Sequence, residues 1–102
     1  MLELRPTCEH CNRALPADAV DVRICSFECT FCATCADDLL GNVCPNCGGG
    51  FVPRPIRPAR NWKGDNYTGK YPPSTTVKHR PVDLAAHRRF SEEIRTIPPH
   101  QR

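Results

Sequence analysis

The hydrophobic pattern of the first fifty residues predicts two short elements. Residues 20–24 alternate between apolar and polar side chains, which is typical of a half-buried strand, and they lead into Cys25. Residues 33–40 predict a short helix that ends at Gly41. The large apolar side chains near these elements form the predicted core: Phe27, Phe31, Leu39, Leu40 and Val43.

The pattern changes after the first fifty residues. Eight of the eleven prolines follow this point, and residues 51–80 predict a Pro-rich basic linker that is extended and poorly ordered. A further helix is predicted within residues 81–98, where Asp83 caps the first turn and a pair of prolines ends the helix. The chain therefore divides into a metal-binding domain at 1–50, a linker and an amphipathic C-terminal helix. Apolar side chains of this helix lie near one face: Leu84, Phe90, Ile94 and Ile97.

The composition leaves little apolar material for a conventional core. Only 39% of the 102 residues are hydrophobic, and eight of these are cysteines. The chain has no apolar run of about 18 residues, and its first ten residues lack the apolar segment of a signal peptide. We therefore expect a cytoplasmic protein without membrane contact, whose cysteines are thiols available to metal rather than disulfides.

Charge is divided unevenly along the chain. Residues 1–47 hold three Lys/Arg against seven Asp/Glu, a balance of −4, whereas residues 48–102 hold eleven against four, a balance of +7. Two Zn²⁺ ions bound to eight thiolates would bring the first segment to about −8. The sequence thus predicts an acidic metal-binding head that is followed by a basic tail.

Cysteine spacing is the strongest chemical signal in the chain. The eight cysteines form four pairs, and eight thiolates fill two tetrahedral shells of Zn²⁺, which prefers four sulfur ligands in this geometry. A filled shell leaves no position for water or substrate, so the pattern favours structural metal over catalytic metal. Two such ions would supply folding free energy that the small core lacks. The pairs are Cys8 with Cys11, Cys25 with Cys29, Cys32 with Cys35, and Cys44 with Cys47.

Four pairs can be shared between two ions in three ways. The sequential division gives one ion the first two pairs, and the nested division places both middle pairs on one ion. In the interleaved division each ion closes a loop that contains ligands of the other, and we favour it, although spacing alone leaves all three open. The interleaved division assigns Cys8, Cys11, Cys32 and Cys35 to site one and Cys25, Cys29, Cys44 and Cys47 to site two.

Two pairs lie in tight turns of the kind that bind metal, Cys8-Glu9-His10-Cys11-Asn12 and Cys44-Pro45-Asn46-Cys47-Gly48. The residue after the second cysteine often needs a positive φ. Asn12 and Gly48 tolerate that conformation, because Gly has no Cβ and Asn can form local hydrogen bonds there.

The order and spacing of the cysteines resemble a RING finger, with Cys29 where that family usually has His. Thr30-Phe31-Cys32-Ala33-Thr34-Cys35 and Cys44-Pro45-Asn46-Cys47 are similar to motifs in its second half, and the likeness covers residues 8–47. This resemblance implies a cross-braced head, in which the interleaved division holds.

A second resemblance covers nearly the whole chain. The segments MLELRPTCEHCNRALP, RICSFECTFCATCADDLLGNVCPNCGG and HRPVDLAAH resemble a family of small bacterial proteins known as domain of unknown function 1272. It implies a cytosolic bacterial zinc-binding protein and supplies no mechanism. The predicted fold is thus a small, irregular, zinc-stabilised α+β fold. It has a RING-like binuclear head with two all-cysteine sites and a Pro-rich basic tail that ends in one α-helix.

The sequence favours a non-catalytic zinc-binding module that acts as a protein-interaction domain or adaptor. Closed metal sites, a small head and an amphipathic tail helix suit this function. The chain has no GxGxxG, GxxxxGK[ST], GxSxG or HExxH motif and its four histidines are scattered, so we predict that it is not an enzyme. The expected partner is another protein.

Three other functions stay open. A RING-type ubiquitin ligase is disfavoured because Glu9-His10 and Gly48 depart from the ligase pattern, and an iron–sulfur or thiol redox protein because eight residues precede Cys44 where a ferredoxin has three. Nucleic-acid binding would use Trp62, Tyr67 or Tyr71 for stacking. Basic tail residues would contact phosphates: Arg54, Arg57, Arg60, Lys63, Lys70, Lys78, Arg80, Arg88 and Arg89.

Overall fold

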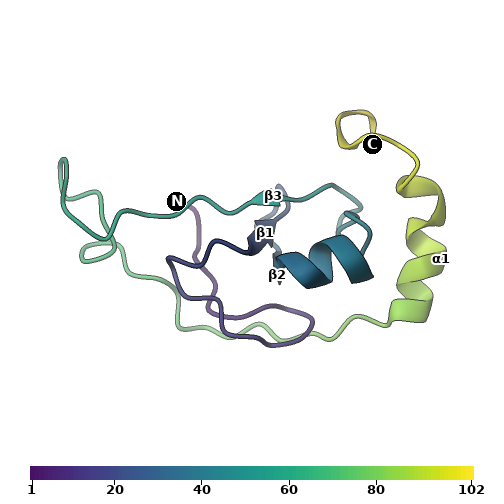
Figure 1. Ribbon diagram of the computed structural model, residues 1–102, viewed down its shortest axis with the longest axis horizontal. Helices are drawn as coiled ribbons and strands as arrows, with labels where there is room; N and C mark the ends of the chain where they lie inside the picture. The colour runs from purple at the N-terminus through teal and green to yellow at the C-terminus, as the bar shows by residue number, and fades with distance from the viewer.

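A three-stranded antiparallel sheet lies at the centre of the molecule. The computed structural model describes all 102 residues, and its strands are β1 (Val22–Ile24), β2 (Thr30–Cys32) and β3 (Val52–Pro53). The strand order is β2-β1-β3, so β1, the strand that the sequence predicted, is the middle strand and pairs with both of the others (Figure 1). Arg23 pairs with Phe31 on one side and with Pro53 on the other.

Three short helices accompany the sheet. The first, η1 (Cys35–Leu39), is a π-helical turn that follows β2 directly, and Gly41 with a φ of +60° ends it, as the sequence predicts. The others are α1 (Leu84–Ile94) and the 3₁₀ turn η2 (Pro99–Gln101). None of these helices is long and apolar enough to cross a membrane.

Cysteine side chains make up about half of the core. The core cluster has eleven buried residues, six of which are cysteines, and it also contains Phe31 and Leu40 as predicted. Two predicted core residues are wrong, since Phe27 is 70% exposed in the turn between Cys25 and Cys29, and Leu39 is 43% exposed on η1. Sequence analysis also missed members of the buried set, namely Leu4 and Leu15.

The Pro-rich segment lies against the head through a buried arginine. Arg54 is only 4% exposed, although it follows an exposed edge strand. Its guanidinium donates to the carbonyl oxygens of Arg5 at 3.0 Å and Pro16 at 2.9 Å. Because burial removes water from this cation, its pKa is lowered, and backbone carbonyls take the place of the lost hydration. Residues just beyond the predicted head therefore contribute a strand and a buried side chain to it.

Residues 80–82, where the chain returns to the head, bind the head around Glu9. The Glu9 side chain is 1% exposed, and its carboxylate accepts hydrogen bonds from Arg5 at 2.8 Å and from the backbone N–H of Thr30 at 2.7 Å. Arg80 donates to the same carboxylate at 3.3 Å, and its backbone N–H donates to the Glu9 carbonyl oxygen at 2.8 Å. The N–H of Val82 donates to His10 Nδ1 at 2.9 Å. The division of the chain into three parts stays a prediction.

Helix α1 buries polar side chains beside the apolar stripe that the pattern predicted. Asp83 caps its first turn as expected, with its carboxylate accepting from the N–H of Ala86. The buried side chains are His87 and Ser91, whereas Leu84 and Phe90 are 39% and 47% exposed. The carbonyl oxygen of Leu40 lies 3.0 Å from His87 Nε2. Ile94 and Phe90 of the stripe lie next to Gly48, so the helix contacts the head through a polar contact and through part of its apolar stripe.

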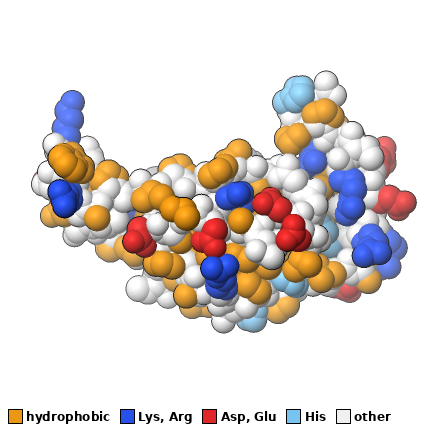
Figure 2. All heavy atoms as spheres, in the orientation of Figure 1, with side chains coloured by type: hydrophobic (Ala, Val, Ile, Leu, Met, Phe, Trp, Pro, Cys, Tyr) orange, Lys and Arg blue, Asp and Glu red, His pale blue; other side chains and the backbone are white.

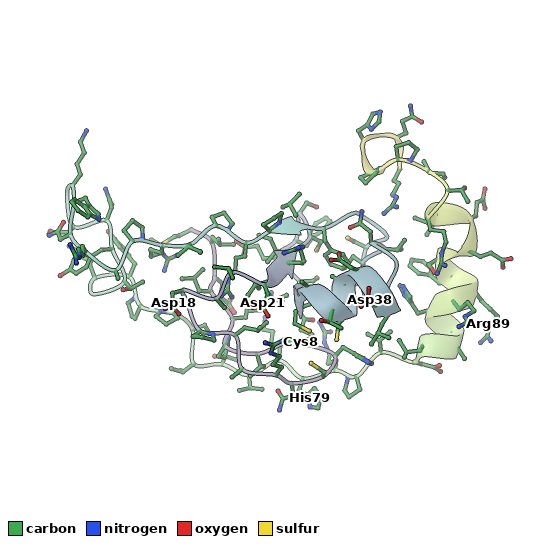
Figure 3. The ribbon with its side chains drawn as sticks, in the orientation of Figure 1. Cys8, Asp18, Asp21, Asp38, His79 and Arg89 are labelled. Atoms are coloured by element: carbon green, nitrogen blue, oxygen red, sulfur yellow. The ribbon has the colours of Figure 1, made fainter.

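We expect Arg54→Met to lower the free energy of unfolding by about 2–3 kcal/mol, because it leaves buried carbonyl oxygens without a donor. Denaturant unfolding in the presence of zinc measures the effect. Arg89→Met is the matched control, because Arg89 is exposed and points away from the head (Figure 3). Equal stability of the two variants would contradict the role given to Arg54.

Candidate metal centre

Four cysteines from two separate segments meet in a first cluster. Cys8 and Cys11 come from the N-terminal loop, Cys32 ends β2, and Cys35 begins η1. Their four sulfur atoms all lie within 4.8 Å of one another, and only Cys11 is exposed. Figure 3 shows sulfur atoms gathered beside η1, near the label of Cys8. We call these four residues cluster one.

The sulfur spacing in cluster one suits a tetrahedral metal. Four sulfurs at about 2.3 Å from a central ion stand about 3.8 Å apart. The sulfur atoms of Cys11 and Cys32 lie 3.9 Å apart. No disulfide joins any of the eight cysteines. The donor set therefore fits a tetrahedral thiolate-bound cation without rearrangement of the chain.

Local backbone geometry prepares the first turn. The N–H of Asn12 donates to the Cys8 carbonyl oxygen at 2.9 Å, and Asn12 has the positive φ, 63°, that the sequence predicts for it. This left-handed residue turns the chain so that both cysteines of the pair point to the same side. Gly48 closes the Cys44 turn in the same way, with a φ of 78° and a hydrogen bond to the Cys44 carbonyl oxygen at 2.8 Å.

Three cysteines form a second cluster, which we call cluster two. The sulfur atoms of Cys25, Cys44 and Cys47 lie within 4.8 Å of one another. Each accepts one backbone hydrogen bond at 3.4 Å, from Phe27, Asn46 and Gly49 respectively. Donors aimed at a sulfur stabilise its thiolate form, which is the form that binds metal.

Cys29 lies next to cluster two but is not one of its members. The side-chain amide of Asn46 donates to the Cys29 sulfur at 3.4 Å, and the Cys29 carbonyl oxygen accepts from the N–H of Cys25 at 3.2 Å. The structure thus brings together seven of the eight predicted ligands, in the grouping of the interleaved division. The role of Cys29 as the eighth ligand stays a prediction.

Burial and crowding oppose full ionisation of these thiols. Burial raises the pKa of the Cys35 thiol, and the side chain of Cys32 and the charge of Cys8 raise it further. Burial also raises the pKa of Cys44 and Cys29, and the nearby thiolate of Cys25 acts in the same direction on both. A divalent cation would remove this repulsion, since it neutralises several thiolates at once.

The Cys8 thiol is the exception in cluster one. Burial raises its pKa, but hydrogen bonds from the backbone of Cys11, Cys32 and His10 outweigh this effect and bring the pKa below its ordinary value. The neighbouring Cys11 has a raised pKa, first because of burial and then because of the Cys8 side chain and charge. These hydrogen bonds thus favour the thiolate form of Cys8, which is the form that binds metal.

Sequence reasoning did not find the residues that support the cysteines. Glu9 and Asn46 each lie between the two cysteines of a turn. Glu9 accepts a hydrogen bond from Arg80 of the tail, and Asn46 donates one to the Cys29 sulfur. Position between two cysteines of a pair is the only sequence signal for either residue. His10 belongs to neither cluster, because its Nδ1 accepts from Val82 instead.

Comparison with known proteins places this cysteine pattern in a family. A family model described as "Protein of unknown function (DUF1272)" matches residues 1–57. An uncharacterized protein of Rhizobium meliloti (strain 1021) is 53% identical over 88 residues, which cover 86% of this chain and 98% of that protein. No solved structure matches the chain.

We expect Cys32→Ser to remove metal from cluster one and to unfold the head, because three sulfurs bind a soft cation far more weakly and the core is built around it. Elemental analysis and NMR dispersion measure the two effects. Thr34→Ser, an exposed position between two cysteines, is the control. A well-dispersed, protease-resistant Cys32→Ser protein would count against this prediction.

We expect Asn46→Ala to weaken metal binding at cluster two by about tenfold or more, since loss of a hydrogen bond to a ligand commonly has an effect of this size. Competition with a chromophoric chelator measures the affinity. The exposed Asn66 makes no side-chain hydrogen bond to sulfur, so Asn66→Ala should bind metal as the unmodified protein does. Unchanged affinity in Asn46→Ala would mean that this hydrogen bond does not support metal binding at cluster two.

Proposed function

The chain belongs to the DUF1272 family of proteins of unknown function, and we propose that it is a non-catalytic zinc-binding module whose metal ions are structural and whose surface binds another protein. One observation carries the proposal. The four sulfurs of cluster one lie within 4.8 Å of one another, three of them are buried, and they come from two segments that are more than twenty residues apart along the chain.

Two Zn²⁺ ions account for all eight cysteines. Cluster one supplies four thiolates, and cluster two supplies four when Cys29 joins the three residues already together. Zinc prefers such sulfur sets, and four sulfurs leave no coordination position for water or substrate. The ions would thus stabilise the head without taking part in a reaction. The buried cysteines also explain the small core, because the protein would replace apolar packing with metal–thiolate bonds.

The surface beside β3 is the best candidate for a protein partner. A hollow of about 490 Å³ there is lined mainly by apolar groups, among them Leu2, Ile24 and Pro55. Val52 in its lining is 59% exposed, and nearby Ile56 along the chain is 48% exposed. Contiguous exposed apolar surface of this kind commonly marks an interaction site.

The partner would use side chains rather than strand pairing at this edge. In the antiparallel register, the backbone nitrogen of Pro53 faces away from β1. The N–H of the next residue, Arg54, donates to the Val22 carbonyl oxygen of β1 instead. Proline has no N–H to offer, so β3 cannot extend the sheet fully at that position. Apolar side chains entering the hollow would therefore supply most of the binding free energy.

Elemental analysis and a UV–visible spectrum of tag-free protein, purified without added metal, test the metal assignment. We expect two zinc atoms per chain and no absorbance above about 350 nm, because closed zinc–thiolate sites have no visible chromophore. Stoichiometric iron with a brown colour would replace the proposal with a redox function.

We expect Val52→Asp to abolish capture of the protein partner while leaving metal content unchanged. A charge placed in the hollow would lose its hydration when the partner binds. Affinity capture followed by mass spectrometry compares the variant with the unmodified protein. Val77→Asp is the matched control, because Val77 is 55% exposed and does not line the hollow. Equal capture by the two variants would exclude this surface.

A further inference from the structure

A projecting lobe forms the end of the molecule farthest from helix α1. Figure 1 shows residues 58–71 extending along the long axis of the molecule, which measures 45 × 27 × 18 Å. Arg57 lies at the base of the lobe, where its guanidinium donates to the carbonyl oxygens of Tyr71 at 2.7 Å and Leu2 at 2.8 Å. The lobe lies beyond the residues that the family model matches. None of its residues belongs to either cysteine cluster, so metal binding does not explain the side chains that the lobe exposes.

Internal hydrogen bonds shape the tip of the lobe. The Asn61 side chain donates to the Asp65 carboxylate at 2.8 Å and accepts from the Asp65 N–H at 3.0 Å. Gly64 and Asp65 both have positive φ, which closes the turn tightly. The tip is thus held in one conformation by polar contacts, and no apolar packing covers the side chains that it carries.

The only tryptophan of the chain sits on this tip. Trp62 is 74% exposed, and the guanidinium of Arg60 lies over its ring, 5.9 Å from the ring centre. Exposure of so large an aromatic ring is unfavourable in water. A preformed turn that holds the ring outward, rather than against the head, points to a ligand that covers it.

The basic residues of the lobe are exposed and unpaired. Arg60, Lys63 and Lys70 are exposed, and none of them takes part in an ion pair. The one acidic residue of the tip, Asp65, accepts from Asn61. Figure 2 shows basic side chains without acidic neighbours at the lobe, whereas acidic and basic side chains are mixed across the middle and at the α1 end. An anionic ligand is therefore attracted to the lobe and repelled by the face of the head.

We propose that the lobe binds single-stranded nucleic acid, with Trp62 stacking on a base and the three cations contacting phosphates. A flat ring among exposed cations matches a strand that alternates flat bases with negative phosphates. The lobe has no helix to enter a duplex groove, so unpaired bases are the target. A lipid surface suits it less well, because one aromatic ring among polar neighbours buries little apolar area in a bilayer.

Fluorescence of Trp62 gives a direct test, since no other tryptophan contributes. We expect an oligothymidylate of about ten nucleotides to quench the emission. Binding should weaken with salt with a slope of about −2 in log K against log salt concentration, from three phosphate contacts. Quenching without salt dependence, or no quenching at low salt, would overturn the proposal.

Variants separate a stacking site from general attraction to positive charge. We expect Trp62→Ala to weaken binding of a fluorescently labelled oligothymidylate at least about fivefold by anisotropy, and Trp62→Phe to weaken it less. Phe27→Ala is the matched control, because Phe27 is a 70% exposed aromatic on the head. Metal content equal to that of the unmodified protein shows that each variant is folded.

A second pair of variants tests the location of the charge. Lys63→Ala with Lys70→Ala should reduce both the affinity and the salt slope, whereas Arg88→Ala with Arg89→Ala, at the other end of the molecule, should change them little. Equal losses in both pairs would show non-specific charge attraction and would overturn the lobe assignment. Stronger quenching by vesicles of equal phosphatidylserine and phosphatidylcholine than by the oligonucleotide would assign the lobe to membranes instead.

Discussion

The mutual closeness of cysteine thiols is the constraint on which the rest of the structure depends. Thiols placed within 4.8 Å of one another and largely buried raise each other's pKa, so the arrangement is stable only when they stay protonated or share a cation. The same sulfurs occupy the positions where a larger domain would place leucine or phenylalanine. Core packing and the capacity to hold metal therefore rest on the same side chains, so a change to one would alter the other.

Polar contacts to the backbone hold the tail against the head, together with the apolar packing of Phe51 and Val82 on the core. Arg54, Arg57 and Arg102 each donate to carbonyl oxygens from distant parts of the chain. A guanidinium offers several donors in a rigid plane, so one side chain can bridge segments that have no shared apolar surface. This explains how a chain with 39% hydrophobic residues fixes a Pro-rich segment along its head.

The sequence predicted the features that follow from local chemistry. The Asn12 and Gly48 turns followed from the conformations that these residues tolerate, whereas cysteine spacing left three divisions of the four pairs open, among them the one that groups Cys8, Cys11, Cys32 and Cys35. Contacts between distant segments were not predictable. The burial of Arg54 depends on carbonyl groups about forty to fifty residues away, and the rotation of α1 depends on the Leu40 carbonyl oxygen that His87 meets. Periodicity reports which side chains are apolar, and it could not show that His87 and Ser91 beside the stripe would be the most buried side chains of the helix.

The separation of charge along the molecule gives its two ends different surroundings. Metal binding would make the acidic head more negative, because each four-thiolate site with one Zn²⁺ adds a charge of about −2. The basic residues of the lobe and of α1 then stand on either side of a strongly negative centre, at the ends of a 45 Å molecule. Because such a centre repels other anions, a polyanion can approach only at the ends. The hollow beside β3 has a mainly apolar lining and suits a different class of ligand. The metal sites would thus determine which surfaces of the protein its partners can reach, as well as whether it folds.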